Sequence, residues 1–317
     1  MTTNQIAVVT GGNSGIGYEM VLQLLRHNAK VYLAARNKTK AEKAMDELKG
    51  KPGVKGILTF VQLDLGDMRS IETFAGEMKE RESHIDYLFN NAGIMEMTVR
   101  ILDANKSATT AQGYEQHVGI NGIGSHYVAK LLIPLLQAAT AAHPDSLARV
   151  IFTSSCVHAN APAHGFDPGA PYGEKDVPPE TSMPMRHYGV SKFYNILCES
   201  LLTATRKLQR DHDDIIFTAV HPGFVRTPII GNPSGLIGLY KRYIKFPLLT
   251  LPQNDGAVTS LMAAFADVGL KKGAYFVPYG RECATISAGY DHAVQDACAY
   301  LLTVAEWCDA QIFKHAA

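Results

Sequence analysis

Short apolar runs alternate with longer amphipathic stretches along most of the chain. Residues 6–9 and 31–34 are continuous apolar runs, and the apolar residues between them recur at helical spacing. Buried parallel strands read as unbroken β-branched runs, while the helices that connect them carry apolar residues on one face. The pattern predicts an α/β fold, with strands at residues 6–9, 31–34, 57–62, 85–89, 149–153, 215–220 and 274–277, and helices at about 38–49, 68–82, 113–139, 188–210, 254–266 and 291–313.

Three segments interrupt this alternation. Residues 94–112 show little periodicity, and residues 157–186 are rich in Pro, Gly and Ala, which predicts an excursion over the surface. Residues 228–252 are apolar and aromatic but are punctuated by Gly and Pro. Because the chain has no internal repeat, low-complexity tract or linker, we expect a single domain over residues 1–317.

Composition narrows the class of protein. The chain has 317 residues, of which 46% are hydrophobic and 19% charged, and its formal net charge is zero. A neutral balance gives no electrostatic reason to expect nucleic acid or an anionic membrane as a partner. No apolar run approaches the ~18 residues of a transmembrane helix. The strand pattern begins by Ile6, so we expect no cleavable signal peptide and a cytoplasmic protein.

The cysteines also favour a cytoplasmic protein. There are five of them, widely scattered and without any CxxC spacing. This pattern predicts reduced thiols and indicates no metal site.

A glycine-rich turn follows the first predicted strand and opens the first helix. Its sequence, from Thr10 to Gly17, is TGGNSGIG, which matches TGxxxGxG but not the general dinucleotide fingerprint GxGxxG. Glycines at 11, 15 and 17 permit a tight turn and close approach of the backbone to a pyrophosphate at the helix N-terminus. The alternative is an ordinary turn between a strand and a helix.

Two side chains just past strand ends bear on which nucleotide binds. Arg36 follows the second strand, where NAD-selective folds of this type carry an acid for the ribose 2′-hydroxyl. A cation there suits a 2′-phosphate, which favours NADP(H) over NAD(H); the alternative is a solvated surface arginine. Asp64 follows the third strand, where it could hydrogen-bond an adenine amino group or N-cap the next helix.

Tyr188 and Lys192 lie four residues apart in a predicted helix. Tyr188 is the only one of the 14 tyrosines with a lysine at that spacing, which places both side chains on one helix face. A phenol titrates near ~10, and an adjacent cation favours its phenolate form. The pair can therefore act as proton donor and acceptor for a carbonyl/alcohol couple. The alternative is a core tyrosine beside a lysine that extends to solvent.

Further motifs occur in a characteristic order after the glycine turn: Asn90-Asn91-Ala92-Gly93, Asn121, Ser155, the Tyr188/Lys192 pair and Pro222-Gly223. With them, residues 5 to about 280 resemble the short-chain dehydrogenase/reductase family, most closely its retinol-dehydrogenase-like group. The resemblance implies a Rossmann-type doubly wound parallel sheet of about seven strands in three α/β/α layers. It also implies an NADP(H)-dependent oxidoreductase acting on a carbonyl or alcohol, in a homodimer or homotetramer.

The resemblance assigns a role to each matching residue. Tyr188 would be the general acid in reduction, Lys192 would depress its pKa and hold the nicotinamide ribose, and Ser155 would bind the substrate oxygen. Asn121 would hold a water in a proton relay. The residues expected to bind the cofactor are Gly11, Asn13, Ser14, Gly15, Ile16, Gly17, Arg36, Asp64, Leu65, Asn91, Ala92, Gly93, Lys130, Tyr188, Lys192, Pro222, Gly223, Val225 and Thr227.

The chain departs from the family pattern in two ways. The segment between Ser155 and Tyr188 is unusually long, so the choice between Ser154 and Ser155 stays open, and we expect the insertion 157–186 to shape the substrate entrance. An N-terminal membrane anchor, which is frequent in the group, is not expected here.

Residues 228–252 occupy the position of the family's substrate lid. Their apolar side chains favour a bulky, largely apolar substrate, but they could equally be core of a subdomain. Three cations among them (Lys241, Arg242 and Lys245) could instead make a weakly membrane-associating helix. Tyr172, His158 and His187 flank the expected site, as substrate contacts or as solvated side chains.

The sequence therefore predicts an enzyme, with ketone reduction as its main reaction. A catalytically silent NADP(H)-sensing regulator is the alternative, although such a protein would be expected to lose part of the catalytic set. A sugar epimerase or dehydratase is disfavoured, because those usually carry TGxxGxxG and a larger C-terminal domain.

Overall fold

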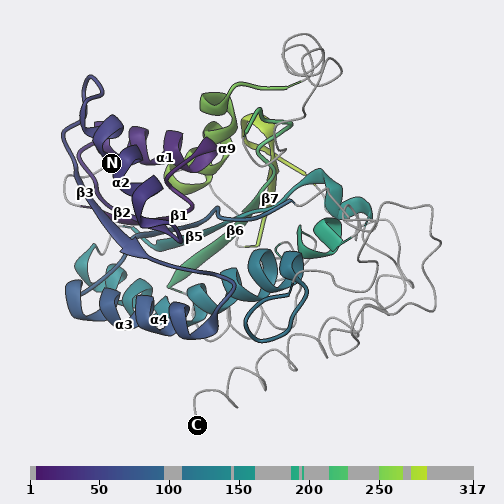
Figure 1. Ribbon diagram of the computed structural model, residues 1–317. Coiled ribbons are helices and arrows are strands. Elements are labelled where there is room, and N and C mark those ends of the chain that lie inside the picture. The colour runs from purple at the N-terminus through teal and green to yellow at the C-terminus, as the bar shows by residue number, and fades with distance from the viewer. Residues whose placement is uncertain are drawn as a thin grey trace.

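The computed structural model describes residues 5–95, 109–143, 146–160, 187–192, 195, 214–227, 250–266 and 273–283 (Figure 1). Their centre is one sheet in the order β3-β2-β1-β4-β5-β6-β7-β8. All neighbouring strands pair in parallel except β7 and β8. The strands are β1 Ile6–Thr10, β2 Lys30–Ala35, β3 Ile57–Gln62, β4 Tyr87–Asn90, β5 Ala148–Thr153, β6 Ile215–Val220, β7 Tyr275–Val277 and β8 Arg281–Glu282.

The predicted doubly wound sheet is confirmed, with eight strands rather than about seven. The additional strand, β8, is two residues long and consists of an exposed Arg-Glu pair, so it carries no apolar run that a sequence pattern could reveal. It follows β7 through a tight turn and pairs antiparallel with it.

Helices cover both faces of the sheet (Figure 1). On one face lie α1 (Gly15–Arg26), α2 (Lys38–Lys49) and α9 (Gln253–Phe265), and on the other lie α3 (Met68–Arg81) and α4 (Ser125–Ala142). Successive side chains of β1 alternate between the two layers: Ile6 and Val8 pack with α3 and α4, and Ala7 and Val9 pack with α1 and α9. Burial on both faces explains why this strand is apolar at every position.

The long helix expected at about 113–139 differs from the structure in its first turns. Residues Val118–Gly124 form a π-helical segment, η2, and regular α-helix begins only at Ser125 and continues to Ala142. Glycines at 119, 122 and 124 give this stretch little preference for α-helix. The buried Asn121 sits in the π-helical turn, a conformation that often marks functional positions.

The other segments that interrupt the alternation are only partly described. Cys156–Asn160 form a short 3₁₀ helix, η3, at the start of the predicted excursion 157–186, and its remaining residues lie outside the described part. Of the segment 228–252, only residues 250–252 are described, and the predicted helix 291–313 falls outside as well.

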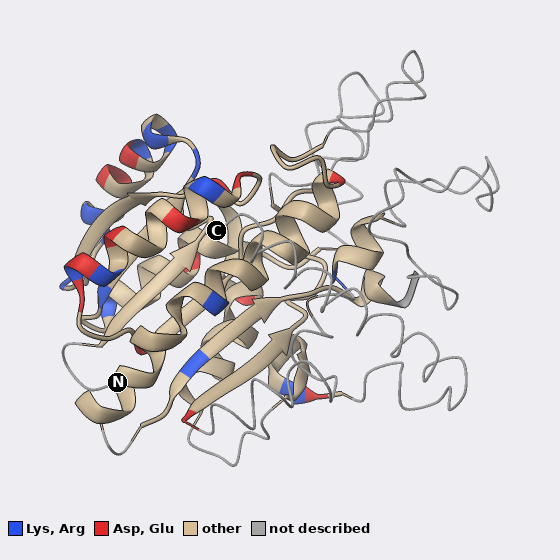
Figure 2. Ribbon diagram, turned by 90° about the horizontal axis from the view of Figure 1, so that it is seen from below, with Lys and Arg blue, Asp and Glu red and all other residues tan. Residues whose placement is uncertain are grey.

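Charged residues lie mainly on the helices rather than on the strands, with both signs interspersed (Figure 2). No described helix is both long enough and apolar enough to cross a membrane.

Candidate active site

A cleft of about 540 Å³ opens at the carboxyl ends of the parallel strands. It spans the boundary between β1 and β4, where the strand order reverses, which is where open α/β sheets bind their ligands. Its lining includes Thr10, Gly11, Asn13, Ser14, Gly15, Ile16, Arg36, Asn37, Lys40, Asp64, Leu65, Asn91, Ala92, Gly93, Ile94, Met95, Ser155, Val157, Tyr188, Lys192, His221, Pro222, Gly223, Phe224, Val225 and Thr227.

The glycine turn forms a cradle at the N-terminus of α1. Gly11 has φ +68°, and a Cβ there would lie 3.0 Å from Ala92 Cα. Ser14 is the N-cap of α1, but its side chain makes no capping hydrogen bond, and the first turn carries no acid. The N–H groups and positive end of this helix therefore face the cleft without an internal anion. These features fit the pyrophosphate of a dinucleotide.

Thr10 ties the two loops of the cleft together, a role that sequence reasoning missed. Its Oγ1 accepts hydrogen bonds from the backbone N–H groups of Asn91 (3.0 Å) and Ala92 (2.9 Å). In return, Asn91 Nδ2 donates to the Thr10 carbonyl at 3.0 Å. The amide of Asn91, predicted to contact the cofactor, thus also holds the glycine turn against the end of β4. The threonine before the first glycine of the motif is the signal that the sequence offers for this role.

Two cations stand at the end of the cleft beyond β2. Arg36 and Lys40 both line it and are both exposed. Asn37 caps α2 by accepting a hydrogen bond from Lys40 N at 2.9 Å, which fixes the first turn from which the Lys40 side chain extends. Lys40 was not predicted, because on the sequence it is one of many helix lysines.

Asp64 lines the cleft and does not cap a helix. The N-cap of α3 is Asp67, which accepts a hydrogen bond from Arg69 N. Asp64 Oδ1 instead accepts from Gly66 N at 2.9 Å, forming a local turn at the end of β3. The capping alternative for Asp64 is therefore wrong, and the residue lines the cleft at the end of β3.

Tyr188, Ser155 and Lys192 converge at the other end, beside the end of β5. A hydrogen bond joins the side chains of Tyr188 and Ser155. Lys192 Nζ lies 5.6 Å from the centre of the Tyr188 ring and donates to the Thr153 carbonyl at 2.7 Å. Ser154 also lines the cleft, but it is buried and its Oγ donates to the Lys192 carbonyl at 2.7 Å. Of the two serines that the sequence left open, Ser155 is the one beside the phenol.

The electrostatics of the pair differ from the expectation that Lys192 depresses the pKa of Tyr188. Burial raises the pKa of Tyr188 to about 12, and the hydrogen bond from Ser155 opposes this only in part. Burial also lowers the pKa of Lys192 to about 8. Both shifts have the same cause, since the interior disfavours either charged form. In the protein alone the phenol is therefore a protonated group, poised to donate.

Asn121 is fully buried behind Lys192, and its amide is used within the protein. Its Oδ1 accepts from Ile94 N at 2.8 Å, and its Nδ2 donates to the Ile94 carbonyl at 2.9 Å and to Ser191 Oγ at 3.0 Å. A Cβ on Gly93 would lie 3.0 Å from Asn121 Oδ1 and 3.4 Å from Lys192 Nζ. Asn121 thus connects the loop after β4 to the helix that carries Tyr188 and Lys192.

Comparisons with known proteins bear on the family of the chain. The family model for short chain dehydrogenases matches residues 5–167. A short-chain dehydrogenase/reductase of Armillaria gallica is 35% identical over 282 residues, which are 88% of this chain and 82% of the relative. One from Phomopsis amygdali is 32% identical, with 88% and 80% of the two chains covered.

The chain belongs to the short-chain dehydrogenase/reductase family. As a member, it is an oxidoreductase that acts on a small molecule. Its placement in the retinol-dehydrogenase-like group stays a prediction.

Solved structures share the fold. The Pseudomonas aeruginosa RhlG/NADP complex has a TM-score of 0.62 at 20% identity, with 87% of this chain and 95% of that chain covered. A 3-ketoacyl-(acyl-carrier-protein) reductase from Brucella melitensis, complexed with NADH, has a TM-score of 0.60 at 18% identity, with 86% and 96% covered. At these identities the likeness establishes the fold of this short-chain dehydrogenase/reductase and leaves its choice of nucleotide open.

Three residues predicted to serve the short-chain dehydrogenase/reductase site do not line the cleft: Gly17, Asn121 and Lys130. Gly17 packs directly against the glycine turn that lines the cleft, because a Cβ there would lie 2.4 Å from the Gly11 carbonyl oxygen. Lys130 is half-buried in α4 and away from the lining residues. All the other predicted site residues line the cleft.

Two buried histidines lie beside Ser155 and Tyr188. His158 is buried rather than solvated, and its Nδ1 lies 2.6 Å from the Ser155 carbonyl oxygen. His117, which sequence reasoning missed, is buried with its ring centre 6.4 Å from that of Tyr188, and its Nδ1 lies 2.6 Å from Glu115 Oε1. His158 thus contacts the backbone of Ser155, and the ring of His117 packs edge-on beside that of Tyr188. Tyr172 lies outside the described residues.

Proposed function

We propose that the protein is an NADP(H)-dependent oxidoreductase that interconverts a carbonyl and an alcohol on a bulky, largely apolar small molecule, with ketone reduction as its main direction. One observation carries the proposal. A single cleft joins a proton-donating group, made of Tyr188, Ser155 and Lys192, to an anion cradle that has two cations beyond it.

In reduction, Tyr188 donates its phenolic proton to the substrate oxygen while that oxygen gains negative charge. Its burial supports this role, because the raised pKa keeps the proton on the phenol at neutral pH until a stronger base forms beside it. Ser155, hydrogen-bonded to Tyr188, orients the same oxygen and stabilises its charge. The nicotinamide, when bound, supplies the hydride or takes it up in the reverse direction.

Lys192 supports the proton transfer from behind the tyrosine. Its ammonium stands close enough to stabilise a phenolate electrostatically once Tyr188 has donated its proton. With a pKa of about 8, Lys192 can also lose and regain a proton near neutral pH. In the proposal, Asn121 holds the water that connects Lys192 to solvent. The side-chain oxygen Oδ1 of Asn121 accepts one hydrogen bond within the protein and can accept a second one from that water.

The nucleotide would lie along the rest of the cleft. The glycine turn and the N-terminus of α1 hold the pyrophosphate, Asp64 and Leu65 contact the adenine, and Val225 and Thr227 bind the carboxamide. Arg36 and Lys40 lie together at the adenosine end, where a 2′-phosphate adds negative charge. A pair of cations there supports NADP(H) over NAD(H).

The apolar mouth of the cleft supports a bulky substrate. Phe224 lines the cleft and leaves 65% of its surface exposed, an unusual state for a large hydrophobic side chain. Ile94, Met95 and Val157 also line the cleft. The predicted lid 228–252 begins directly after Thr227, so the chain that could cover a bound substrate starts at this mouth.

Turnover on a substrate panel tests the function. We expect the purified chain to consume NADPH with bulky ketones, aldehydes or quinones, and to consume it slowly or not at all with small polar carbonyls. The measurement is the loss of NADPH absorbance, with each product identified by mass spectrometry. Oxidation of NADPH without a reduced product, or turnover confined to small hydrophilic carbonyls, would contradict the proposed reaction or substrate class.

Replacing Arg36 tests the choice of nucleotide. We expect Arg36→Gln to weaken NADPH binding by about tenfold to 100-fold, because a charge-assisted hydrogen bond to phosphate contributes about 1.5–3 kcal/mol. NADH binding should change little. Lys38→Gln is the matched control, since it removes the same charge two residues away at an exposed position outside the cleft. Fluorescence titration measures both affinities, and equal losses with NADPH and NADH would show that Arg36 does not bind the 2′-phosphate.

A further inference from the structure

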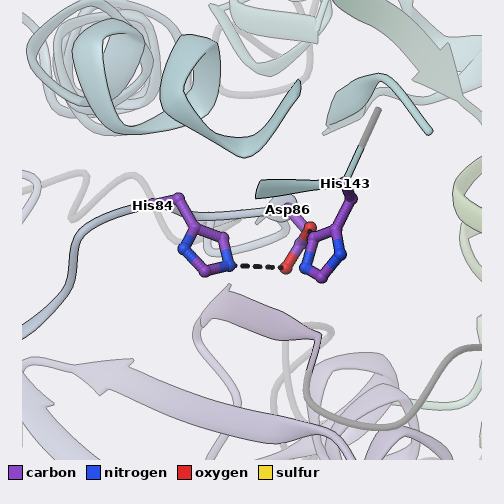
Figure 3. Close-up of side chains that lie close together, drawn as sticks. All are labelled: His84, Asp86 and His143. Atoms are coloured by element: carbon purple, nitrogen blue, oxygen red, sulfur yellow. Dashed lines mark ion pairs between the residues drawn. The ribbon is translucent and has the colours of Figure 1, made fainter. Parts of the chain in front are cut away.

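A cluster of two histidines and an aspartate lies at the opposite edge of the sheet from the cleft. His84 follows α3, Asp86 directly precedes β4, and His143 is the C-cap of α4 (Figure 3). Asp86 stands just before the first residue of β4, and β4 runs parallel to β1. The cluster therefore lies at the amino ends of the parallel strands, whereas the cleft lies at their carboxyl ends. The cluster therefore takes no part in the proposed reaction.

Both imidazole rings are turned toward the carboxylate (Figure 3). His84 Nε2 lies 3.7 Å from Asp86 Oδ2, and His143 Nε2 lies 3.4 Å from Asp86 Oδ1. These separations are longer than the 2.7–2.9 Å of a charge-assisted hydrogen bond. Both Nε2 atoms are buried and have no hydrogen-bond partner among the described residues. Two imidazole nitrogens thus point at one carboxylate without bonding to it.

The surroundings prepare these atoms to act as ligands. Ser83 Oγ lies 3.1 Å from His84 Nδ1, a contact in which Nδ1 can carry the proton and leave a lone pair on Nε2. The backbone N–H of Ile6 donates to Asp86 Oδ2 at 2.7 Å and fixes the carboxylate. Metal-binding histidines and carboxylates are commonly held by such second partners.

The spacing is close to that required around a tetrahedral ion. Zinc binds imidazole nitrogen and carboxylate oxygen at about 2.0–2.2 Å, so neighbouring ligand atoms in a tetrahedron lie roughly 3.3–3.6 Å apart. One ligand atom from each of the three residues lies within 4.8 Å of the other two. The side chains of His84 and His143 are 17% and 26% exposed, so solvent can reach the edge of the cluster and supply a fourth ligand.

We propose that His84, Asp86 and His143 form a binding site for a divalent transition metal, with Zn²⁺ as its ion and a water as its fourth ligand. Two nitrogens and one oxygen favour Zn²⁺ over Mg²⁺ or Ca²⁺, which take all-oxygen ligand sets. The ion joins the end of α3, the start of β4 and the end of α4. Its role is to hold these three elements together.

Zinc titration of the untagged, full-length chain tests the site after dialysis against a chelator. We expect one Zn²⁺ per chain by calorimetry at this site, and a melting temperature that rises with Zn²⁺ concentration and falls again with EDTA. Loss of one ligand, in His84→Gln or His143→Gln, should weaken binding by more than about 100-fold. His27→Gln is the matched control, because His27 is an exposed histidine at the end of α1.

Substitution of Co²⁺ into the wild-type chain keeps the test independent of whether the variants fold. Intense visible absorption bands typical of tetrahedral Co²⁺, displaced by Zn²⁺, are the expected result. A pale octahedral spectrum, the lack of tight Zn²⁺ binding, or binding that survives both histidine variants unchanged would overturn the proposal and leave a histidine–aspartate ion-pair cluster. NADPH turnover is not part of the readout, so this test stands apart from that of the proposed function.

Discussion

Tyr188→Phe should lower kcat by about 10²–10⁴-fold, the range that a positioned general acid contributes. The substitution removes only the phenolic oxygen and leaves the ring, so the neighbouring packing, including the contact with His117, is kept. Affinity for NADPH should stay close to that of the wild type, because the glycine turn and Arg36 are untouched. Single-turnover kinetics and fluorescence titration of the same preparation measure the two quantities separately.

Tyr279→Phe is the matched control for this prediction. Tyr279 is 61% exposed and does not line the cleft, so loss of its hydroxyl should leave turnover unchanged. A Tyr188→Phe enzyme that retains kcat would remove Tyr188 from the role of general acid. If NADPH affinity falls as well as turnover, the phenol also holds the nucleotide, and the loss of kcat would no longer measure proton transfer alone.

The elements that were predictable from the sequence are those with a strong local pattern. The β1 run and the glycine turn after it are such a pattern, because a strand buried on both faces has no polar position and the turn needs particular residues. The π-helical segment Val118–Gly124 was not predictable in this way. Within it, Asn121 binds the backbone of Ile94, a contact with the loop after β4 that no local sequence pattern reveals.

The cleft and the histidine–aspartate cluster were likewise predictable only where their residues are close in the sequence. Tyr188 and Lys192 share a helical turn, so their proximity could be read from their spacing. The shift in the pKa of Tyr188 could not, because it follows from how deeply the folded chain buries the phenol. His84 and Asp86 lie in the short connection between α3 and β4, whereas His143 follows α4 more than 50 residues later, and only the fold brings it to them. The expectation of no metal site rested on the cysteines alone, so it did not consider these histidines.

Gly17→Ala should weaken NADPH binding by about tenfold to 100-fold and destabilise the fold. Gly17 lies in the first turn of α1, where alanine is normally the better helix former. A Cβ at this position would nevertheless lie 2.4 Å from the Gly11 carbonyl oxygen and 2.7 Å from Asn91 Nδ2. Overpacking of this kind costs about 1–3 kcal/mol, and the atoms that must move belong to the cradle itself.

Gly76→Ala is the matched control, and we expect it to stabilise the fold. Gly76 is exposed in the middle of α3, and a Cβ there would meet nothing within 4 Å. This variant should gain about 0.5–1 kcal/mol in the free energy of unfolding and bind NADPH as the wild type does. Chemical denaturation and fluorescence titration of both variants therefore compare one substitution in two helices with opposite expected signs. If Gly17→Ala were stabilised like Gly76→Ala and bound NADPH unchanged, the turn would have room for a side chain. The close approach of α1 to Gly11 would then not be what shapes the nucleotide site.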